Sequence, residues 1–576
     1  MPILQITIDE LLTNKEQTLQ QIEKAWDEIP LMNDIGLDSL KNGSLVRFRG
    51  MVQDMHSPEY YLDMYEIKNT ITNEKTMRNG KYKDIIDVHD NEVFTFESDT
   101  NVNKERQTFV VISMPGLNSW TRNLENESKK LQLCTSSNQT KRKIEDEVEE
   151  METSDSSSSV TSKKICENTT ESSSESQNLK NISPEFLLNC PLADRPGKAC
   201  LVKVYEDYDW IKINEMIETV GFLAVSPLPT NPTTSDDGTV DMENQVMNPP
   251  PSLIPRIHSI VIKRITHDNP LLPTKLESYN DSLNPFRDVF KDLHLVLTQL
   301  LLGDKLAAEF LICHLISRVY LRKDVISLGQ CTINFSNIPS EKYENYVKNI
   351  YEILELMVPK SHYFPMTLDN MNSLEFTPKK DYDCNRLTTG LLQLSAHTHL
   401  IIDESRLQAG RLDQIGVKNV QALANVVRNQ RLPYDFKFYQ MDYDTDIPVL
   451  IFSEGKSLLP CDFHVPLEPD SECVKTLNEI IEASKHFLNS NLLDRIRKFL
   501  TIARHSNCEL TDDIQEVIQE DFVEMRKKDQ KINSEDLHKL LVLSRLIALS
   551  EGQCKVGVDA WKRAQVLETE RKSRLK

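Results

Sequence analysis

Two stretches of the chain contain too few apolar residues to form a hydrophobic core of their own, and they divide the sequence into blocks. Residues 133–182 are rich in serine and acidic residues, and residues 227–256 are rich in proline, threonine and acidic residues. Such segments cannot bury enough apolar surface to offset the conformational entropy that is lost on folding. We therefore expect a disordered insertion at 133–182 and a disordered linker at 227–256, both suited to phosphorylation.

The N-terminal sequence has the pattern of an amphipathic helix followed by short strands. Apolar spacing predicts a helix over 8–29, and alternating apolar residues predict strands at 44–55, 60–67, 107–116, 199–213 and 219–226. This spacing favours a small barrel or sandwich, and we expect a barrel like the oligonucleotide/oligosaccharide-binding (OB) fold. Residues 1–132 would contain the helix and the first half of the barrel, and 183–226 the second half, because a surface connection tolerates a long insertion.

From residue 257 onward, helical and strand patterns alternate, which is typical of an α/β core. We expect this core to span 257–470 and a helical region to span 471–576. The predicted strands are 331–335, 399–403 and 449–452, with a hairpin at 434–448. The predicted helices are 306–321, 341–357, 417–429, 475–489, 492–503, 512–528, 534–550 and 559–571.

Charge and cysteine usage exclude several classes of function. The chain of 576 residues has 67 Lys and Arg against 88 Asp and Glu, a net charge of −21. An excess of acid disfavours default binding to duplex DNA, because affinity for a phosphate backbone comes from cations. The 11 cysteines form no C-x-x-C pair, so we expect neither a zinc site nor a disulfide framework. The N-terminus lacks the pattern of a leader peptide and no stretch is apolar enough to span a membrane, so we expect an intracellular, soluble protein.

The strongest candidate for a catalytic site is the run HLIIDE, an apolar strand that ends in Asp403 and Glu404. In P-loop nucleotide hydrolases, an Asp in this place holds Mg²⁺ and the next acid orients water. An acidic turn at a strand end is the alternative interpretation. A phosphate loop would decide between them, but Gly455-Lys456-Ser457 has Leu450 where the pattern requires the first glycine.

Long runs of the sequence resemble the MCM-binding protein family, whose members associate with the minichromosome maintenance (MCM) replicative helicase. The resemblance covers nearly the whole chain and is carried by SLVRFRGMVQDMHSPEYY, LLGDKLAAEFLICHLIS and IIDESRLQAGRLDQIGVKNVQAL, among others. It implies a nuclear protein that binds MCM subunits. It also implies roles in MCM assembly or stability, removal of MCM from chromatin, DNA replication, the cell cycle with mitosis and cell division, and sister-chromatid cohesion.

The chain is also similar to the helicase subunits themselves, which implies a degenerate AAA+/MCM-like α/β domain with a C-terminal helical lid. By this resemblance, LLGDKLAAEFLI corresponds to the phosphate loop. Gly303 would be its first glycine, while Leu306, Glu309 and Phe310 would replace the second glycine, the lysine and the Ser/Thr. An acid at the lysine position would repel ATP. The resemblance therefore implies a pseudo-ATPase that retains only Asp403 and Glu404 from the site.

Three further features resemble binding sites for DNA, for single-stranded nucleic acid and for a metal ion, but their residues argue against each. The predicted hairpin at 434–448 carries Asp442, Asp444 and Asp446 against the single Lys437, so we expect it to repel DNA. The barrel aromatics sit among too few cations for a single-strand groove, and we expect them to pack in the core or face a protein. His397 and His399 would share a strand face but lack a third ligand.

We therefore expect a non-catalytic scaffold: a nuclear adaptor or chaperone with MCM subunits as partners, chromatin contacted only indirectly, no sequence-specific DNA binding, and no cofactor or metal. Two alternatives stay open, a regulatory nucleotide-binding ATPase that uses Asp403 and Glu404, and a single-strand-binding OB module. Two basic clusters have the spacing of a bipartite nuclear import signal: Lys129, Lys130, Lys141, Arg142 and Lys143.

Overall fold

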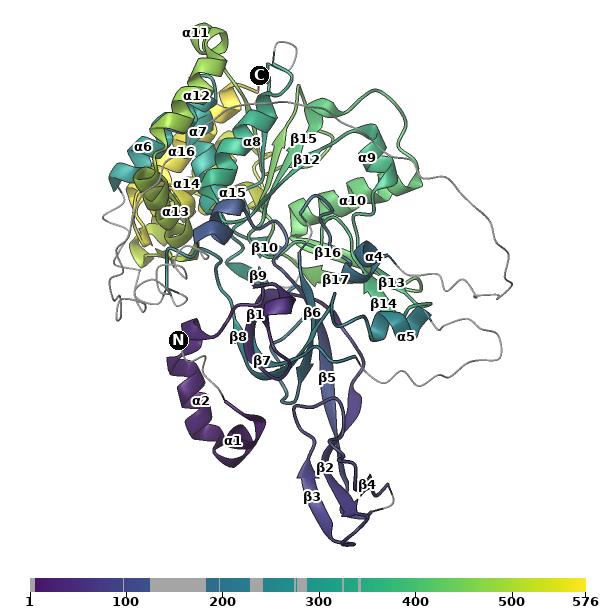
Figure 1. Cartoon of the computed structure of the whole chain (residues 1–576). Helices are drawn as coiled ribbons and strands as arrows, with labels where there is room; N and C mark the ends of the chain where they lie inside the picture. The colour runs from purple at the N-terminus through teal and green to yellow at the C-terminus, as the bar shows by residue number, and fades with distance from the viewer. Residues whose placement is uncertain are drawn as a thin grey trace, which may run out of the picture.

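The computed structural model in Figure 1 describes residues 6–96, 98–124, 183–195, 197–227, 242–273, 276, 287–323, 326–339 and 343–575. It has mixed α/β architecture with several sheets, as the sequence predicts. A barrel lies beside a larger α/β body. The insertion expected at 133–182 and the five residues of the expected import signal lie outside the described residues.

Five strands of the N-terminal half close into a barrel. Strand β1 pairs with both β5 and β7, and β8 joins β6 to β7, so the ring has no free edge. All pairs are antiparallel except β6 with β8. The strands are β1 (Leu45–Met55), β5 (Val102–Ile112), β6 (Ala199–Val204), β7 (Met216–Ala224) and β8 (Arg256–Arg264).

The insertion separates two strands that pair directly. Strands β5 and β6 are hydrogen-bonded in register from Gln107 opposite Val204 to Ile112 opposite Ala199. Apolar side chains of both strands, including Phe109 and Val202, are buried in the barrel core. Residues on both sides of 125–182 therefore belong to one sheet.

The expected boundary near residue 257 is wrong. Strand β8 completes the barrel, although the sequence analysis assigned it to the α/β core. The expected linker is also wrong over 242–256, because α5 (Met242–Met247) forms there and Val246 and Ile254 are buried. The proline-rich composition predicted disorder, but the few apolar residues of this segment bury their side chains and so stabilise it.

Two short helices replace the predicted helix over 8–29. Helix α1 (Ile8–Thr13) begins with a capping box between Thr7 and Glu10, and α2 (Lys15–Lys24) follows after Asn14. The non-helical backbone of Asn14 interrupts the hydrogen-bond ladder. Both helices cover the barrel, where Leu11 and Ile22 join one apolar cluster with Phe222.

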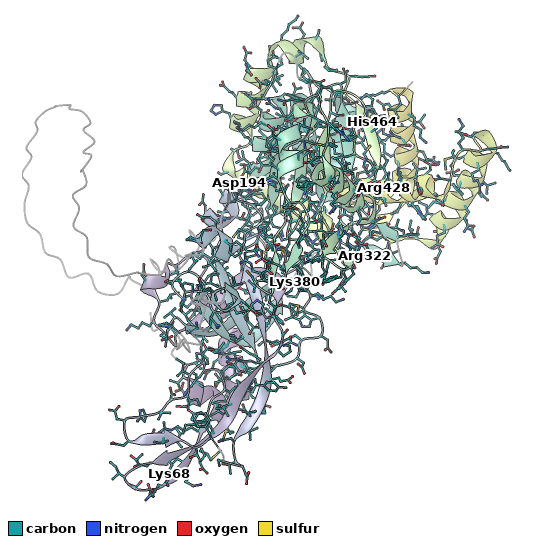
Figure 2. The ribbon with its side chains drawn as sticks, turned by 90° about the vertical axis from the view of Figure 1, so that its right-hand side faces the viewer. Lys68, Asp194, Arg322, Lys380, Arg428 and His464 are labelled. Carbon is teal, nitrogen blue, oxygen red and sulfur yellow. The ribbon has the colours of Figure 1, made fainter. Side chains whose placement is uncertain are left out.

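An arm of three strands projects from the barrel. It consists of β2 (Glu59–Asn69), β3 (Lys75–Asn79) and β4 (Glu92–Phe94), and both β3 and β4 pair with β2. Lys68 marks its far end in Figure 2, at the opposite side of the molecule from His464 in the α/β body. Strand β2 joins the arm to the barrel by pairing with β5.

The α/β body is built on a parallel sheet with the order β12-β15-β18-β11-β19. The first strand in sequence therefore lies between the fourth and the fifth. Side chains alternate between two cores, since Ile401 faces one and its neighbours Leu400 and Ile402 face the other. The strands are β11 (Ile333–Ser336), β12 (Ser361–Pro365), β15 (His399–Asp403), β18 (Val449–Phe452) and β19 (Phe463–Pro466).

Helices cover both faces of this sheet (Figure 1). The first face carries α6 (Arg287–Leu300), α7 (Lys305–Ile316), α8 (Tyr346–Met357), α12 (Leu477–Phe487), α13 (Ser490–His505), α14 (Asp512–Lys528), α15 (Ser534–Ser550) and α16 (Val558–Ser573). The second carries α9 (Leu368–Ser373) and α10 (Gln414–Asn429). The predicted limits of α14 and α15 are confirmed, and Asn533 caps α15.

A second sheet, formed by two hairpins, contacts the barrel. Its strands are β13 (Lys379–Asp381), β14 (Arg386–Thr388), β16 (Arg431–Asp435) and β17 (Gln440–Asp444), in the order β14-β13-β16-β17. Asp54 Oδ2 of the barrel accepts a hydrogen bond from the Leu387 backbone N–H at 2.7 Å. Tyr434 Oη donates to Asn214 Oδ1 at 2.8 Å.

Short elements complete the described fold. They are α4 (Pro184–Leu188), α11 (Ser471–Lys475), β9 (Leu321–Lys323), β10 (Ile326–Leu328), β20 (Glu509–Leu510) and β21 (Lys555–Val556), with single 3-10 turns at Trp26–Glu28, Leu37–Ser39 and Glu404–Arg406. None of the described helices is long and apolar enough to cross a lipid bilayer.

A buried ion pair joins the barrel to the parallel sheet. Lys360 Nζ, just before β12, lies 2.5 Å from Asp268 Oδ2, which follows β8, and the two side chains are 2% and 8% exposed. Trp120 adds to this junction by donating from Nε1 to the Val358 carbonyl at 3.0 Å while its ring packs under the Arg497 guanidinium. A buried pair of opposite charges holds its two elements in one relative position, because neither charge tolerates losing its partner.

A cluster of buried and half-buried histidines lies around this pair. Arg504 donates to His399 Nε2, so His399 carries its proton on Nδ1 and donates to His314, whose Nδ1 faces the Cys331 carbonyl. Burial lowers the pKa of all five histidines in the cluster, to about 4 for His314. They are His267, His314, His397, His399 and His505.

Substituting Asp268 by Ala should lower the free energy of unfolding by about 3–5 kcal/mol, because Lys360 would remain buried and charged without a partner. Chemical denaturation of the full chain measures this change. The exposed ion pair of Glu472 and Lys475 provides the control, and Glu472→Ala should cost less than about 1 kcal/mol. Equal effects of the two substitutions would contradict the assigned role of the buried pair.

Acidification should destabilise the fold below about pH 6.5, the ordinary pKa of histidine. At lower pH the histidines become protonated in the unfolded chain, whereas in the folded chain they stay neutral. Each such histidine therefore lowers the free energy of unfolding by up to about 1.4 kcal/mol per pH unit. Three carboxyl groups act in the opposite direction, because burial raises the pKa of Asp462 to about 6 and also raises the pKa of Glu215 and Glu404, but they are fewer than the five histidines. Unfolding measured between pH 7 and 5 should show the loss, and His314→Asn should reduce its slope while the exposed His486→Asn should not. A flat profile would refute this.

Candidate functional site

The carboxyl edge of the parallel sheet is where an α/β fold of this type places a ligand, and it is where Asp403 lies. This side chain is 1% exposed. Tyr363 Oη donates to Asp403 Oδ2 at 2.7 Å, and Ser405 Oγ donates to Oδ1 at 2.5 Å. Burial and then the bond to Asp403 raise the pKa of Tyr363, which keeps its hydroxyl a donor. Both oxygens of Asp403 are therefore occupied by donors of this chain.

Glu404 is occupied in a similar way. Its Oε2 accepts a hydrogen bond from Ser457 Oγ, and its Oε1 accepts one from the Leu458 backbone N–H at 2.7 Å. Burial raises the pKa of Glu404, and these two bonds act against that rise. Ser457 belongs to the Gly455-Lys456-Ser457 run, so this run stabilises the loop after β18. The acids expected as residual magnesium ligands lie at the sheet edge and act there as acceptors of internal hydrogen bonds.

The loop that follows the first strand of the sheet is the position at which a phosphate loop would stand. It spans 337–345, between β11 and α8, and its sequence NIPSEKYEN contains no glycine. Without glycine, backbone N–H groups cannot approach phosphates closely. In the described part of the loop, Asn337 donates to the Leu467 carbonyl at 2.8 Å and Glu344 pairs with Arg406 at 2.7 Å.

The structure corrects the expected phosphate-loop positions Gly303, Leu306, Glu309 and Phe310. They lie in the turn between α6 and α7 and in α7 itself, which precede β11 instead of following a strand. Leu306 and Phe310 are buried in the helical core, and Glu309 forms an ion pair with Arg563. Helix α7 is buried on nearly all sides, so Leu306 and Phe310 serve packing, as expected for a helix in the centre of a helical layer. The alignment with a phosphate loop is therefore wrong.

The two histidines at the start of β15 do not share a strand face. His397 has a positive φ of 67° and lies in the preceding turn, with Nδ1 3.3 Å from Asp446 Oδ2. His399 belongs to β15 and accepts its hydrogen bond from Arg504. Among the described residues, no group of three histidine, cysteine or acidic side chains is placed to hold a metal ion.

The barrel cations that a nucleic-acid groove would use are paired with acids of the barrel. Arg47 and Arg49 both contact Glu218, at 3.2 and 3.0 Å, and Lys203 contacts Glu59 at 2.6 Å. The aromatic side chains Phe48, Tyr61, Tyr65 and Tyr205 are buried or packed against other rings, whereas Tyr60 is 75% exposed. Trp210 packs under the Arg264 guanidinium. This arrangement supports packing of these aromatics, as the sequence analysis expects for most of them.

The hairpin of β16 and β17 carries exposed aromatic rings that were not predicted as a site. Phe438 and Tyr439 at its tip are 80% and 57% exposed, and Tyr382 of the neighbouring hairpin is 48% exposed. Of the three acids expected to repel DNA, Asp442 is exposed, Asp444 pairs with Arg431 at 3.1 Å, and Asp446 lies at the histidine cluster. The repeated aromatics in YDFKFYQMDYD were the signal that could have found this surface.

Comparison with known proteins supports the sequence resemblance to the MCM-binding protein family. Residues 16–575 match the model of the family described as mini-chromosome maintenance replisome factor. Two proteins named mini-chromosome maintenance complex-binding protein are similar along their length: that of Drosophila melanogaster is 41% identical, covering 96% of this chain and 93% of the relative, and that of Homo sapiens is 37% identical, covering 97% and 93%. The chain therefore belongs to the mini-chromosome maintenance complex-binding protein family.

Proposed function

We propose that this chain binds MCM helicase subunits as a non-catalytic adaptor or chaperone in the nucleus. The proposal includes support of MCM assembly or stability, removal of MCM from chromatin, and a resulting need for the protein in DNA replication and sister-chromatid cohesion. The names of the relatives, which describe binding to the MCM complex, support the partner. Nuclear placement is supported by that partner and by the basic run Lys141 to Lys143.

The architecture supports a helicase-like shape. We propose that the closed barrel is OB-like, on the basis of its five strands and the single parallel pair β6–β8. We propose that the α/β body is AAA+-like, on the basis of the strand order β12-β15-β18-β11-β19 and the acids that end β15. The helices α12 to α16 would be its C-terminal lid. Such a body would present the faces with which helicase subunits contact their neighbours.

The occupied carboxylates support the absence of catalysis, and they are the observation that carries this part of the proposal. A magnesium ion needs ionised oxygens that are open to it. Here each of the four carboxylate oxygens already accepts a hydrogen bond, from Tyr363, Ser405, Ser457 or the Leu458 N–H, which leaves it less open to a metal ion. The glycine-free loop at 337–345 supports the same conclusion, as it lacks a cradle for phosphates.

A pull-down from nuclear extract with the full chain tests the partner. We expect recovery of MCM subunits to the same extent with and without ATP, because the proposed contact uses shape and no nucleotide. Failure to recover MCM subunits, or recovery that requires ATP, would contradict the proposal.

Titration of the full chain with a fluorescent ATP analogue and Mg²⁺ tests the rival ATPase function. We expect no saturable binding below about 1 mM, the range of an interaction weaker than about 4 kcal/mol. Asp403→Asn and Glu404→Gln should leave recovery of MCM subunits unchanged, since both residues serve the internal structure of the sheet edge. Binding that is tight and is lost in Asp403→Asn would establish a working nucleotide site instead.

A further inference from the structure

The tip of the β16–β17 hairpin, together with the adjoining turn of β13 and β14, forms an exposed aromatic surface. Its apolar members are Tyr382, Phe438, Tyr439 and Met441, which are 48, 80, 57 and 47% exposed. Figure 2 marks Lys380 on β13, between the barrel and the parallel sheet. Several large apolar side chains exposed side by side are unusual on a surface that contacts only water, and they indicate a binding partner.

These rings are held in place before any partner arrives. Phe436 and Tyr439 stack with an interplanar angle of 8° and centroids 5.0 Å apart, and Phe438 lies edge-on to Tyr382 at 5.9 Å. Tyr382 Oη donates to the Phe436 carbonyl at 2.9 Å and so joins the two hairpins. The buried Tyr434, next to the turn, anchors the hairpin to the barrel through Asn214. A surface fixed in this way loses little conformational entropy on binding.

The charges around the rings are predominantly acidic. Asp383 and Asp442 are exposed and form no ion pair among the described residues, and Asp381 and Asp435 accept backbone N–H groups of the two turns. Lys437 stands near the Phe438 ring, and Lys380 donates to the Asn385 carbonyl. Carboxylates beside aromatic faces match guanidinium or ammonium groups, which pair with the former and stack on the latter. The same carboxylates repel phosphate.

We propose that this hairpin surface docks a basic segment of an MCM subunit that also carries apolar side chains. The inference rests on the proposed function for the identity of the partner. Its apolar residues would cover Phe438 and Tyr382, and its arginines or lysines would contact Asp383, Asp442 and the Tyr439 ring. A single strand of nucleic acid would stack on the same rings but would meet the acids, so it fits the surface poorly.

Binding of purified MCM subunits to the full chain and its variants tests the proposal. Phe438→Ser combined with Tyr439→Ser should weaken binding by roughly tenfold or more, as loss of aromatic anchors does at protein interfaces. Phe487→Ser on α12, 45% exposed in the native chain, is the matched control and should change nothing. Asp383→Lys with Asp442→Lys should weaken binding by a similar factor. Because these side chains are exposed, unfolding curves of all variants should match the parent.

Other results of these binding measurements would contradict the hairpin surface, its occupant or the proposed function. Native binding by the hairpin variants, with the parent chain also binding, would refute this surface and leave the proposed function standing. Absence of binding by the parent chain would refute the proposed function itself. Stronger binding after alanine substitution of Lys141, Arg142 and Lys143 would show that the chain's own basic run is the occupant. Binding of a fluorescent oligonucleotide that is lost in Phe438→Ser with Tyr439→Ser would assign the surface to nucleic acid.

Discussion

The buried ion pair of Lys360 and Asp268 sets the relation between the two bodies of the molecule. Each charge neutralises the other where both side chains are buried, so the strand that completes the barrel cannot separate from the sheet without a large loss of free energy. The hydrogen bonds of Asp54 and Asn214 to the hairpin sheet depend on this fixed position, because their partners lie on the other body. The exposed hairpin surface is thereby presented on a rigid support.

The carboxyl edge of the parallel sheet is the part of the fold on which the proposed absence of catalysis rests. Asp403 ends β15 and Glu404 begins the turn after it, and their oxygens accept hydrogen bonds from neighbouring side chains and backbone. The loop at 337–345 has no glycine with which to approach phosphates. Relatives that are named for binding the MCM complex belong to the same family. Under the proposed function this fold contributes a binding surface, because function depends on sites and does not follow from the fold alone.

Much of this fold could be predicted from periodicity alone. Strand β15 and helices α14 and α15 have the limits that their apolar patterns indicate, because their cores are continuous and their ends are marked by polar caps. Strand β8 was assigned to the wrong body, since only pairing across the barrel reveals where a short apolar run belongs. The phosphate-loop alignment at Gly303 failed because a short motif without its strand cannot fix a position. The hairpin aromatics were missed because their repetition in YDFKFYQMDYD was not weighed, and the exposure that marks them as a surface appears only in the structure.

Hydrogen–deuterium exchange of the full chain tests the central claim most directly, measured alone, with Mg²⁺ and ATP, and with MCM subunits. The account predicts that ATP leaves exchange unchanged at 337–345 and 399–406, while MCM subunits slow exchange at 431–444. Slower exchange at the sheet edge on addition of ATP alone would contradict it, because it would show that the carboxylates release their internal donors and accept a nucleotide with its metal ion.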